Sequence, residues 1–338
     1  MTWPLIARPG TTTGVIDVLT GCPRIPAATG LALVTTTPAP PVTDEGNVTD
    51  FLLSTAWRWL SFPTTEASDK FYLNAEQELV FADEDSPAFM AGAFEFLSAL
   101  WLDEEKVRQA FQSGNGVGWH DHSACLFRGT ERFFRPGYNA NLIDSWLPAL
   151  EGVAEKLERG VDVADVGCGH GASTVLMAQA FPNSRFVGFD YHAPSIERAR
   201  KAAEVAGVGV NTRFDVAAAK SYPGTYDLVT FFDCLHDMGD PTGAATHVHG
   251  SLKPDGTWMI VEPFAHDHLA ANLNPVGRVY YAASTFVCTP ASVSQEVGLA
   301  LGAQAGEARL RKVVTGGGFK RLRRAAETPF NMVLEARP

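Results

Sequence analysis

The stretch VDVADVGCGHGASTVLMAQAFPNSRFVGFDYH, residues 161–192, decides the fold that this sequence predicts. Its apolar opening, with Val161, Val163 and Val166, has the pattern of a buried strand and stops at three glycines spaced two apart. A helix-forming segment follows, then a Pro-Asn turn, and then a second strand, RFVGFD, which ends on Asp190. A strand, a glycine turn, a helix and a strand with a terminal acid are typical of the nucleotide-binding half of a doubly wound α/β fold.

The spacing of the glycines separates two classes of cofactor. Gly167, Gly169 and Gly171 follow the pattern G-x-G-x-G, whereas a dinucleotide site has G-x-G-x-x-G with the pyrophosphate at a helix N-terminus. Asp165, two residues before the first glycine, would repel a pyrophosphate but suits a ligand that carries an ammonium group. S-adenosylmethionine (SAM) is such a ligand, and Asp190 would accept hydrogen bonds from its ribose hydroxyls. We therefore favour SAM over NAD; a turn that serves packing alone is the third interpretation.

Composition and charge exclude several other classes. The chain has 338 residues, enough for two domains, and a net charge of −11, which argues against broad binding to a nucleic-acid backbone. Its five cysteines form no C-x-x-C pair and no zinc-ligand spacing, which indicates a reducing compartment and no metal. No apolar run reaches the length of a membrane span. We expect a soluble, cytoplasmic protein with no nucleic-acid or membrane partner.

The chain divides into three parts. Residues 1–47 are rich in Thr, Pro and Gly without a helical period, which predicts a poorly ordered tail. Residues 48–135 contain apolar stripes at helical spacing, and residues 136–338 continue the alternation of strands and helices. A mostly helical insertion at about 267–303 interrupts that alternation before a closing hairpin. Five parallel strands plus the hairpin predict a seven-stranded sheet with one antiparallel strand.

Two groups of side chains before residue 136 are ambiguous. His120 and His122 lie two apart in a glycine-flanked loop, where they would bind a metal, line a pocket or serve the loop alone; no third ligand stands nearby. The aromatic stripe is typical of a core or a dimer contact rather than of a cofactor site. It consists of Phe89, Phe94, Phe96 and Trp101.

His236 follows the fourth predicted strand, at the edge of the sheet where ligands of open α/β folds bind. A neutral imidazole there would take the proton from a hydroxyl group as its oxygen attacks a methyl group. The alternative is a histidine that only positions ligands, since proximity and orientation alone can carry a methyl transfer.

The runs LHDM and IVEP resemble the corresponding region of the small-molecule O-methyltransferases found in plants. In that family the histidine is the general base, and two acids orient it. The resemblance maps the base onto His236 and the acids onto Glu262 and Glu307. Met238 stands where the family has tryptophan.

Residues 76–338 as a whole are similar to a bacterial family of SAM-dependent methyltransferases with an N-terminal winged-helix-like dimerisation domain. The stretches that carry the likeness include FADEDSPAF, GVGWHDH, ERFFRPGY, ADVGCGHGAST, GFDYHAPSIERAR and FFDCLHDMGDP. The family implies a Rossmann-like sheet, SAM as cofactor, a small-molecule acceptor and a homodimer, although residues 1–50 do not match its first helices. The residues expected to bind the cofactor are Asp165, Gly167, Cys168, Gly169, Asp190, Tyr191, Asp215, Val216, Phe232 and Asp233.

Two functional hypotheses follow. The first is an enzyme that moves a methyl group from SAM to a small, apolar or aromatic acceptor, most readily at oxygen, under a roof formed by Tyr280, Tyr281 and Phe286. The second is a SAM-responsive regulator that binds DNA through a winged helix, which requires a basic recognition helix. The basic cluster of this chain, residues 309–324, lies at the opposite end from the expected winged helix, so we favour the enzyme.

Overall fold

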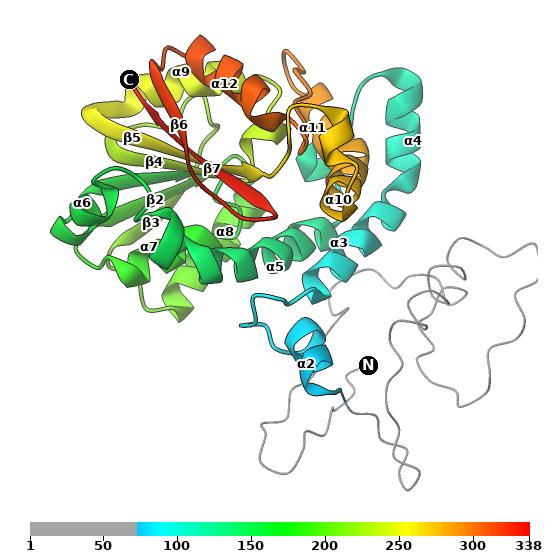
Figure 1. Cartoon of the computed structure of the whole chain (residues 1–338), viewed down its shortest axis with the longest axis horizontal. Coiled ribbons are helices and arrows are strands. Elements are labelled where there is room, and N and C mark those ends of the chain that lie inside the picture. Colours follow the sequence, from blue (N-terminus) through cyan, green and yellow to red (C-terminus); the bar gives the residue numbers. More distant parts are fainter. Residues whose placement is uncertain (1–72) are drawn as a thin grey trace, which may run out of the picture.

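The computed structural model describes residues 73–338, which form an α/β unit with a group of helices beside one end of its sheet (Figure 1). The expected tail, residues 1–47, and the beginning of the expected helical region lie outside the described residues. The rest of that region, residues 73–135, is helical and contains no strand, so a wing is not present in this described part. No helix within residues 73–338 is long and apolar enough to cross a lipid bilayer.

The sheet has seven strands in the order β3-β2-β1-β4-β5-β7-β6. The strands are β1 (Asp162–Val166), β2 (Arg185–Asp190), β3 (Thr212–Val216), β4 (Tyr226–Phe232), β5 (Leu252–Pro263), β6 (Arg321–Glu327) and β7 (Asn331–Arg337). The first five strands are parallel, and β7 runs antiparallel to both β5 and β6. The predicted seven-stranded sheet with one antiparallel strand is therefore confirmed.

Helices connect and cover the strands in the doubly wound manner. The α-helices are α2 (Ala75–Phe81), α3 (Ala91–Leu102), α4 (Glu104–Ser113), α5 (Ala124–Asn141), α6 (Val153–Arg159), α7 (Ala172–Ala180), α8 (Ala193–Val205), α9 (Pro241–Ser251), α10 (Pro275–Ala283), α11 (Thr289–Val293) and α12 (Gly306–Gly316). Shorter 3-10 or π turns are η2 (Trp119–Asp121), η3 (Leu142–Trp146), η4 (Leu235–Asp237), η5 (Leu269–Asn272) and η6 (Ser284–Cys288). The insertion expected at about 267–303 thus contains α10, η6 and α11.

The two faces of the sheet bury separate cores. Val163 and its neighbour Ala164 in β1 are both fully buried but belong to different apolar clusters, because successive strand residues point to opposite faces. One cluster includes Trp146 of η3, and the other includes Trp258 of β5. A parallel sheet covered on both faces directs its ligand sites to the carboxyl ends of the strands.

Helices α3 and α5 approach each other closely because glycines face the contact. A Cβ atom added at Gly129 would lie 2.4 Å from the backbone nitrogen of Phe96, and one at Gly92 would lie 2.5 Å from the carbonyl carbon of Arg132. Glu95 is fully buried in this contact, where it accepts a hydrogen bond from Arg132 at 3.0 Å. The helix pair that borders the site is therefore tightly fixed.

Candidate functional site

The glycine turn after β1 has the left-handed backbone that its sequence predicts. Gly167, Gly169 and Gly171 have φ values of 74°, 52° and 82°. A Cβ atom at Gly167 would lie 2.7 Å from Sγ of Cys234, whereas one at Gly169 would meet no atom within 4 Å. The turn is therefore packed from below at Gly167 and faces open space at Gly169.

Asp190 ends β2 beside this turn. Its Oδ2 accepts a hydrogen bond from the N–H of Gly169 at 3.0 Å, and its Oδ1 accepts one from the N–H of His192 at 2.8 Å. Burial raises the pKa of this carboxyl group, and the two backbone donors oppose the shift. Each oxygen keeps a second lone pair, so the carboxylate can still accept hydrogen bonds from a diol.

Asp165 lies beneath the turn and is 1% exposed. Its Oδ2 accepts hydrogen bonds from the hydroxyls of Ser173 at 2.7 Å and Thr174 at 2.5 Å, and its Oδ1 accepts one from Thr230 at 3.0 Å. These bonds join β1 to the start of α7 and to β4. Burial raises the pKa of Asp165. These hydrogen bonds give Asp165 a structural role. A bound cofactor would interact with it only through the negative charge that its carboxylate places below the turn.

Other expected cofactor residues line the same rim beyond β2 and β3. Val216 pairs in register with Asp190 and is 53% exposed, and Tyr191 is also exposed. Asp215 is turned to an ion pair with Arg213, Nε to Oδ2 2.8 Å. Cys168, on the turn itself, is buried. The rim therefore presents Tyr191 and Val216 on either side of Asp190.

Asp233, immediately after β4, has a left-handed backbone with φ of 48°, which is uncommon for a residue other than glycine. The hydroxyl of Tyr138 donates to its Oδ2 at 2.8 Å, and Nδ2 of Asn331 donates to its Oδ1 at 2.9 Å. The preceding residue, Phe232, packs its ring against Tyr138 with centroids 5.3 Å apart. Burial, and then repulsion from Glu262, raise the pKa of Asp233 to about 8. Neither Tyr138 nor Asn331 was expected from the sequence.

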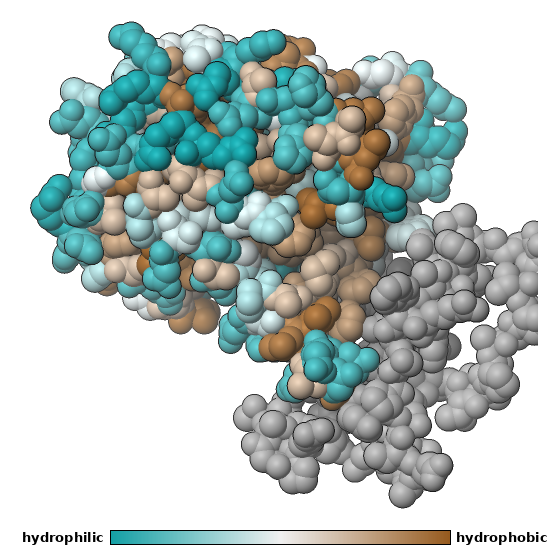
Figure 2. Space-filling model, viewed as in Figure 1, coloured by the Kyte–Doolittle hydropathy of each residue, from teal (hydrophilic) through white to brown (hydrophobic). Residues whose placement is uncertain are grey.

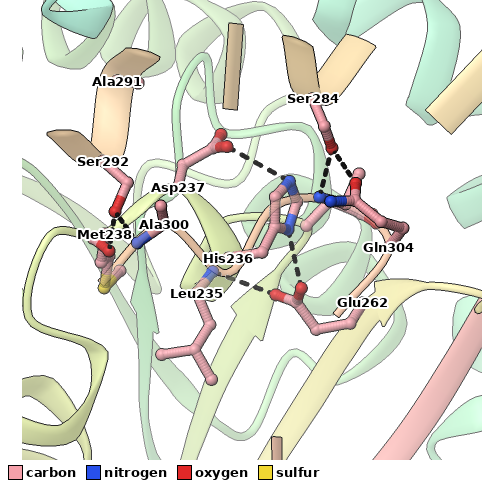
Figure 3. A network of polar contacts seen from close by, with 12 residues as sticks. Leu235, His236, Asp237, Met238, Glu262, Ser284, Ala291, Ser292, Ala300 and Gln304 are labelled. Carbon is pink, nitrogen blue, oxygen red and sulfur yellow. Dashed lines mark hydrogen bonds and ion pairs between the residues drawn. The ribbon is translucent and has the colours of Figure 1, made fainter. Parts of the chain in front are cut away.

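His236 lies in η4 between two carboxylates (Figure 3). Its Nδ1 is 2.7 Å from Oε2 of Glu262, and its Nε2 is 3.3 Å from Oδ1 of Asp237. The N–H of Leu235 donates to the other oxygen of Glu262 at 3.0 Å. Burial alone would lower the pKa of His236, but the charges of Asp237 and Glu262 outweigh it and hold the pKa well above the ordinary 6.5. The structure thus brings Glu262 to His236, as the resemblance implied.

The second acid expected beside His236 is elsewhere. Glu307, in α12, forms ion pairs with Arg311 at 2.7 Å and with Arg324 at 2.8 Å, and the structure does not bring it to the imidazole. Asp237 instead lies at the other ring nitrogen. Its place directly after His236 in the sequence was the signal that would have found it, because a tight turn carries both side chains to the same edge.

The two loop histidines, His120 and His122, lie in different environments. His122 is buried, its Nδ1 lies 3.0 Å from Oδ2 of Asp103, and the N–H of Ser123 donates to that same oxygen at 2.7 Å. Burial lowers the pKa of His122, against the effect of Asp103. His120 is largely exposed, and its ring lies 6.0 Å from that of Tyr191.

The insertion packs against the N-terminal helices, beside the site. Val287 and Phe286 of η6 share an apolar cluster with Ala99 of α3 and Leu126 of α5. Tyr280 is buried and donates its hydroxyl to the carbonyl of Phe330 at 2.6 Å. Figure 2 shows hydrophobic surface gathered on the side of the molecule that carries α3 and α10. Together these helices, α3–α5 with α10 and η6, form what we call the cap.

Three of the seven basic residues within 309–324 form ion pairs with acids. Arg311 and Arg324 share Glu307, and Arg323 pairs with the buried Glu335. This pairing reduces the positive charge that a phosphate backbone would meet.

Relatives with known names share this architecture. The chain is 32% identical over 129 residues, 37% of its length, to an enzyme named ubiquinone biosynthesis O-methyltransferase from Pseudomonas aeruginosa, and it spans about half (53%) of that relative. An O-methyltransferase family protein from Burkholderia thailandensis has a similar structure, with a TM-score of 0.62 at 17% identity over 86% of this chain and 83% of that one. Human N-acetylserotonin methyltransferase, solved in complex with SAM, gives 0.58 at 16% identity over 86% and 82%. Identities this low establish a shared fold.

A family match covers the part of the chain that contains the glycine turn, Asp190 and His236. The Methyltransferase domain family matches residues 157–307. The strand order, the glycine turn and the acid at the end of β2 agree with that match. Residues 157–307 are therefore similar to a methyltransferase domain, and the described residues have the seven-stranded fold of the two solved methyltransferases named above.

Proposed function

We propose that this chain transfers a methyl group from SAM to an oxygen atom of a small, apolar or aromatic acceptor. The observation that carries the proposal is the buried pair of His236 and Glu262, which lies just beyond β4 on the rim where the cofactor would bind. The name of the ubiquinone-pathway relative supports oxygen as the methylated atom.

The rim fits a cationic cofactor. Burial raises the pKa values of four carboxyl groups at this rim, those of Asp165, Asp190, Asp233 and Asp237. The positive charge of a cationic cofactor would stabilise their ionised forms. SAM carries a sulfonium and an ammonium group, whereas a dinucleotide would bring an anionic pyrophosphate to the same carboxylates. The open space at Gly169 and the free lone pairs of Asp190 would accommodate the ribose.

The residues around His236 suit it to accept a proton. When bound, SAM supplies an activated methyl group on its sulfonium sulfur. In the neutral ring, which forms above its raised pKa, the Nδ1–H of His236 donates to Glu262 and the lone pair is on Nε2. That nitrogen takes the proton of the acceptor hydroxyl while the oxygen attacks, and Glu262 stabilises the imidazolium that results. Asp237, 3.3 Å from Nε2, would hold the acceptor hydroxyl beside the base.

The cap would exclude water from the reaction. Helices α3–α5 and the insertion meet through buried apolar side chains and the partly buried Phe286. An acceptor enclosed beneath them would be largely apolar. The exposed large side chains Phe94, Leu97 and Trp101 on α3 support the further proposal that a second copy of the chain packs there. Light scattering tests that homodimer directly.

The enzymatic proposal is tested by incubating the chain with isotopically labelled SAM and a panel of phenolic and hydroxylated compounds, with products read by mass. We expect at least one compound to gain a methyl group, and His236→Gln to lower that yield under the same conditions. A chain that binds SAM but methylates no compound of the panel would contradict the proposal and favour a SAM-responsive binding protein.

A further inference from the structure

Two buried histidines beneath the cap are oriented in the same way. Nδ1 of His122 lies 3.0 Å from Asp103, and Nδ1 of His236 lies 2.7 Å from Glu262. In both cases a carboxylate fixes the ring and directs Nε2 to the other side. Histidines that bind metals are held in this manner, with the second nitrogen bonded to a carboxylate.

Two further potential ligands lie at the ring of His236. The ligand atoms of His236, Asp237 and Cys288 are all within 4.8 Å of one another. The fold brings His236 and Asp237 of η4 together with Cys288 of η6, which is distant in the sequence.

The side chains of this cluster are removed from water. His236 is 3% exposed, Cys288 is 6% exposed, and Oδ1 of Asp237 is buried in an ion pair with Nε2 of His236 at 3.3 Å. The oxygen of a carboxylate has more than one lone pair, so Oδ1 can also bind a ligand. A cation bound among these three groups would satisfy their buried polar atoms.

The geometry and chemistry of the cluster suit one class of ion. Zinc bonds of about 2.0–2.2 Å to nitrogen and oxygen place tetrahedral ligand atoms about 3.3–3.6 Å apart. Nε2 of His236 and Oδ1 of Asp237 are 3.3 Å apart. A thiolate and imidazoles select zinc over magnesium or calcium, which prefer oxygen ligands. We propose that His236, Asp237 and Cys288 bind one divalent zinc-type ion, with a water molecule as the fourth ligand.

This ion would use the nitrogen that accepts the proton in methyl transfer. A metal bound to Nε2 of His236 occupies the lone pair, so the metal-loaded chain has no base at that position. This consequence rests on the proposed function, whereas metal binding itself does not.

The test is a titration of the full, chelator-stripped chain with Co²⁺, which reports its ligands by absorption. We expect one equivalent of Co²⁺ to give the visible bands of tetrahedral coordination and a thiolate-to-cobalt band in the near ultraviolet, both abolished by adding Zn²⁺. Cys288→Ser should remove the thiolate band, and Cys168→Ser, at a buried thiol outside the cluster, should retain it. Glu262→Gln should weaken Co²⁺ binding about 10–100-fold, because that acid orients His236.

Two results would overturn the proposal. One is a wild-type chain that shows no thiolate band at one equivalent of Co²⁺, which would leave His236 and Asp237 as an ordinary ion pair. The other is a thiolate band that persists in Cys288→Ser. Neither measurement depends on turnover, so a chain that binds the metal in this way but transfers no methyl group would refute the proposed function alone.

Discussion

Nδ1 of His236 lies 2.7 Å from Oε2 of Glu262, and both side chains are almost fully buried. Glu262 comes from β5, whereas His236 comes from the turn after β4, so the pair joins two neighbouring strands at the ligand-binding edge. The carboxylate fixes both the orientation of the ring and the nitrogen that carries the proton. A histidine held in this way is ready to accept a proton at Nε2.

Replacing that imidazole should lower turnover without lowering cofactor affinity. His236→Gln is expected to reduce kcat by about 10²–10⁴-fold, because general-base catalysis contributes by that factor. SAM affinity should change by no more than a few-fold, since the ring faces the acceptor side of the rim. Steady-state kinetics and calorimetry measure the two quantities. Near-native turnover of this variant on the true acceptor would remove the base from the mechanism.

The pH dependence of turnover should report the two carboxylates at His236. Because their charges raise its pKa, the neutral base forms only as the pH rises above the ordinary value of about 6.5, and kcat should increase with pH through that range. Asp237→Asn removes one negative charge, so the rising limb should move to lower pH. Glu155→Gln in α6, away from the rim, is the control. The pH profiles of kcat are measured at saturating SAM with a chelator present. Identical profiles for wild type and Asp237→Asn would contradict the assignment of Asp237 as a charge that raises the pKa of His236.

Asp190 should dominate cofactor affinity. Asp190→Ala removes the carboxylate that we propose accepts hydrogen bonds from the ribose hydroxyls, and it is expected to weaken SAM binding by about 2–4 kcal/mol. The matched control is Asp162→Ala, at the opposite end of the parallel strands, where the acid pairs with Arg185 and Lys253. Calorimetry should find that the SAM affinity of Asp162→Ala equals that of the wild type. Equal losses in the two variants would mean that a general change in the fold, rather than a lost contact, lowers the affinity.

The glycines of α5 should differ in their tolerance of a methyl group. Gly129→Ala places a Cβ atom against the backbone of α3 and should reduce the free energy of unfolding by about 1–3 kcal/mol or more. Gly137→Ala, in the same helix with no atom within 4 Å of its Cβ, should raise it by about 0.5–1 kcal/mol. Denaturant unfolding measures both. Similar effects at the two positions would show that α3 and α5 are not tightly packed in solution.

The fold and the cofactor rim were predictable because their signals are local. The glycine turn, Asp190 and the alternation of strands with helices lie within short windows, and the period of apolar residues fixes which side of a strand faces the core. The end of the fourth predicted strand placed His236 at the rim, whereas its pairing with Glu262, 26 residues away, required the family resemblance.

The remaining site contacts depend on packing between distant segments. Tyr138 and Asn331 reach Asp233 across 95 and 98 residues of sequence, and no periodicity encodes such a meeting. Glu307 illustrates the reverse. The family resemblance suggested it as a partner for His236, but its carboxylate pairs with Arg311, one turn along α12, and with Arg324. Long-range pairs of charged side chains are decided by tertiary packing.

The place of β7 in the sheet affects how the protein is made. Residues 331–337 follow every other described strand along the chain, yet they lie between β5 and β6 and hydrogen-bond to both. During translation the parallel strands leave the ribosome first, and β5 then presents an open edge of unpaired backbone groups until β7 emerges. A chaperone, or the β7 of a neighbouring nascent chain, would find its binding surface in that interval. The yield of native protein should therefore depend on how quickly the final strand is delivered.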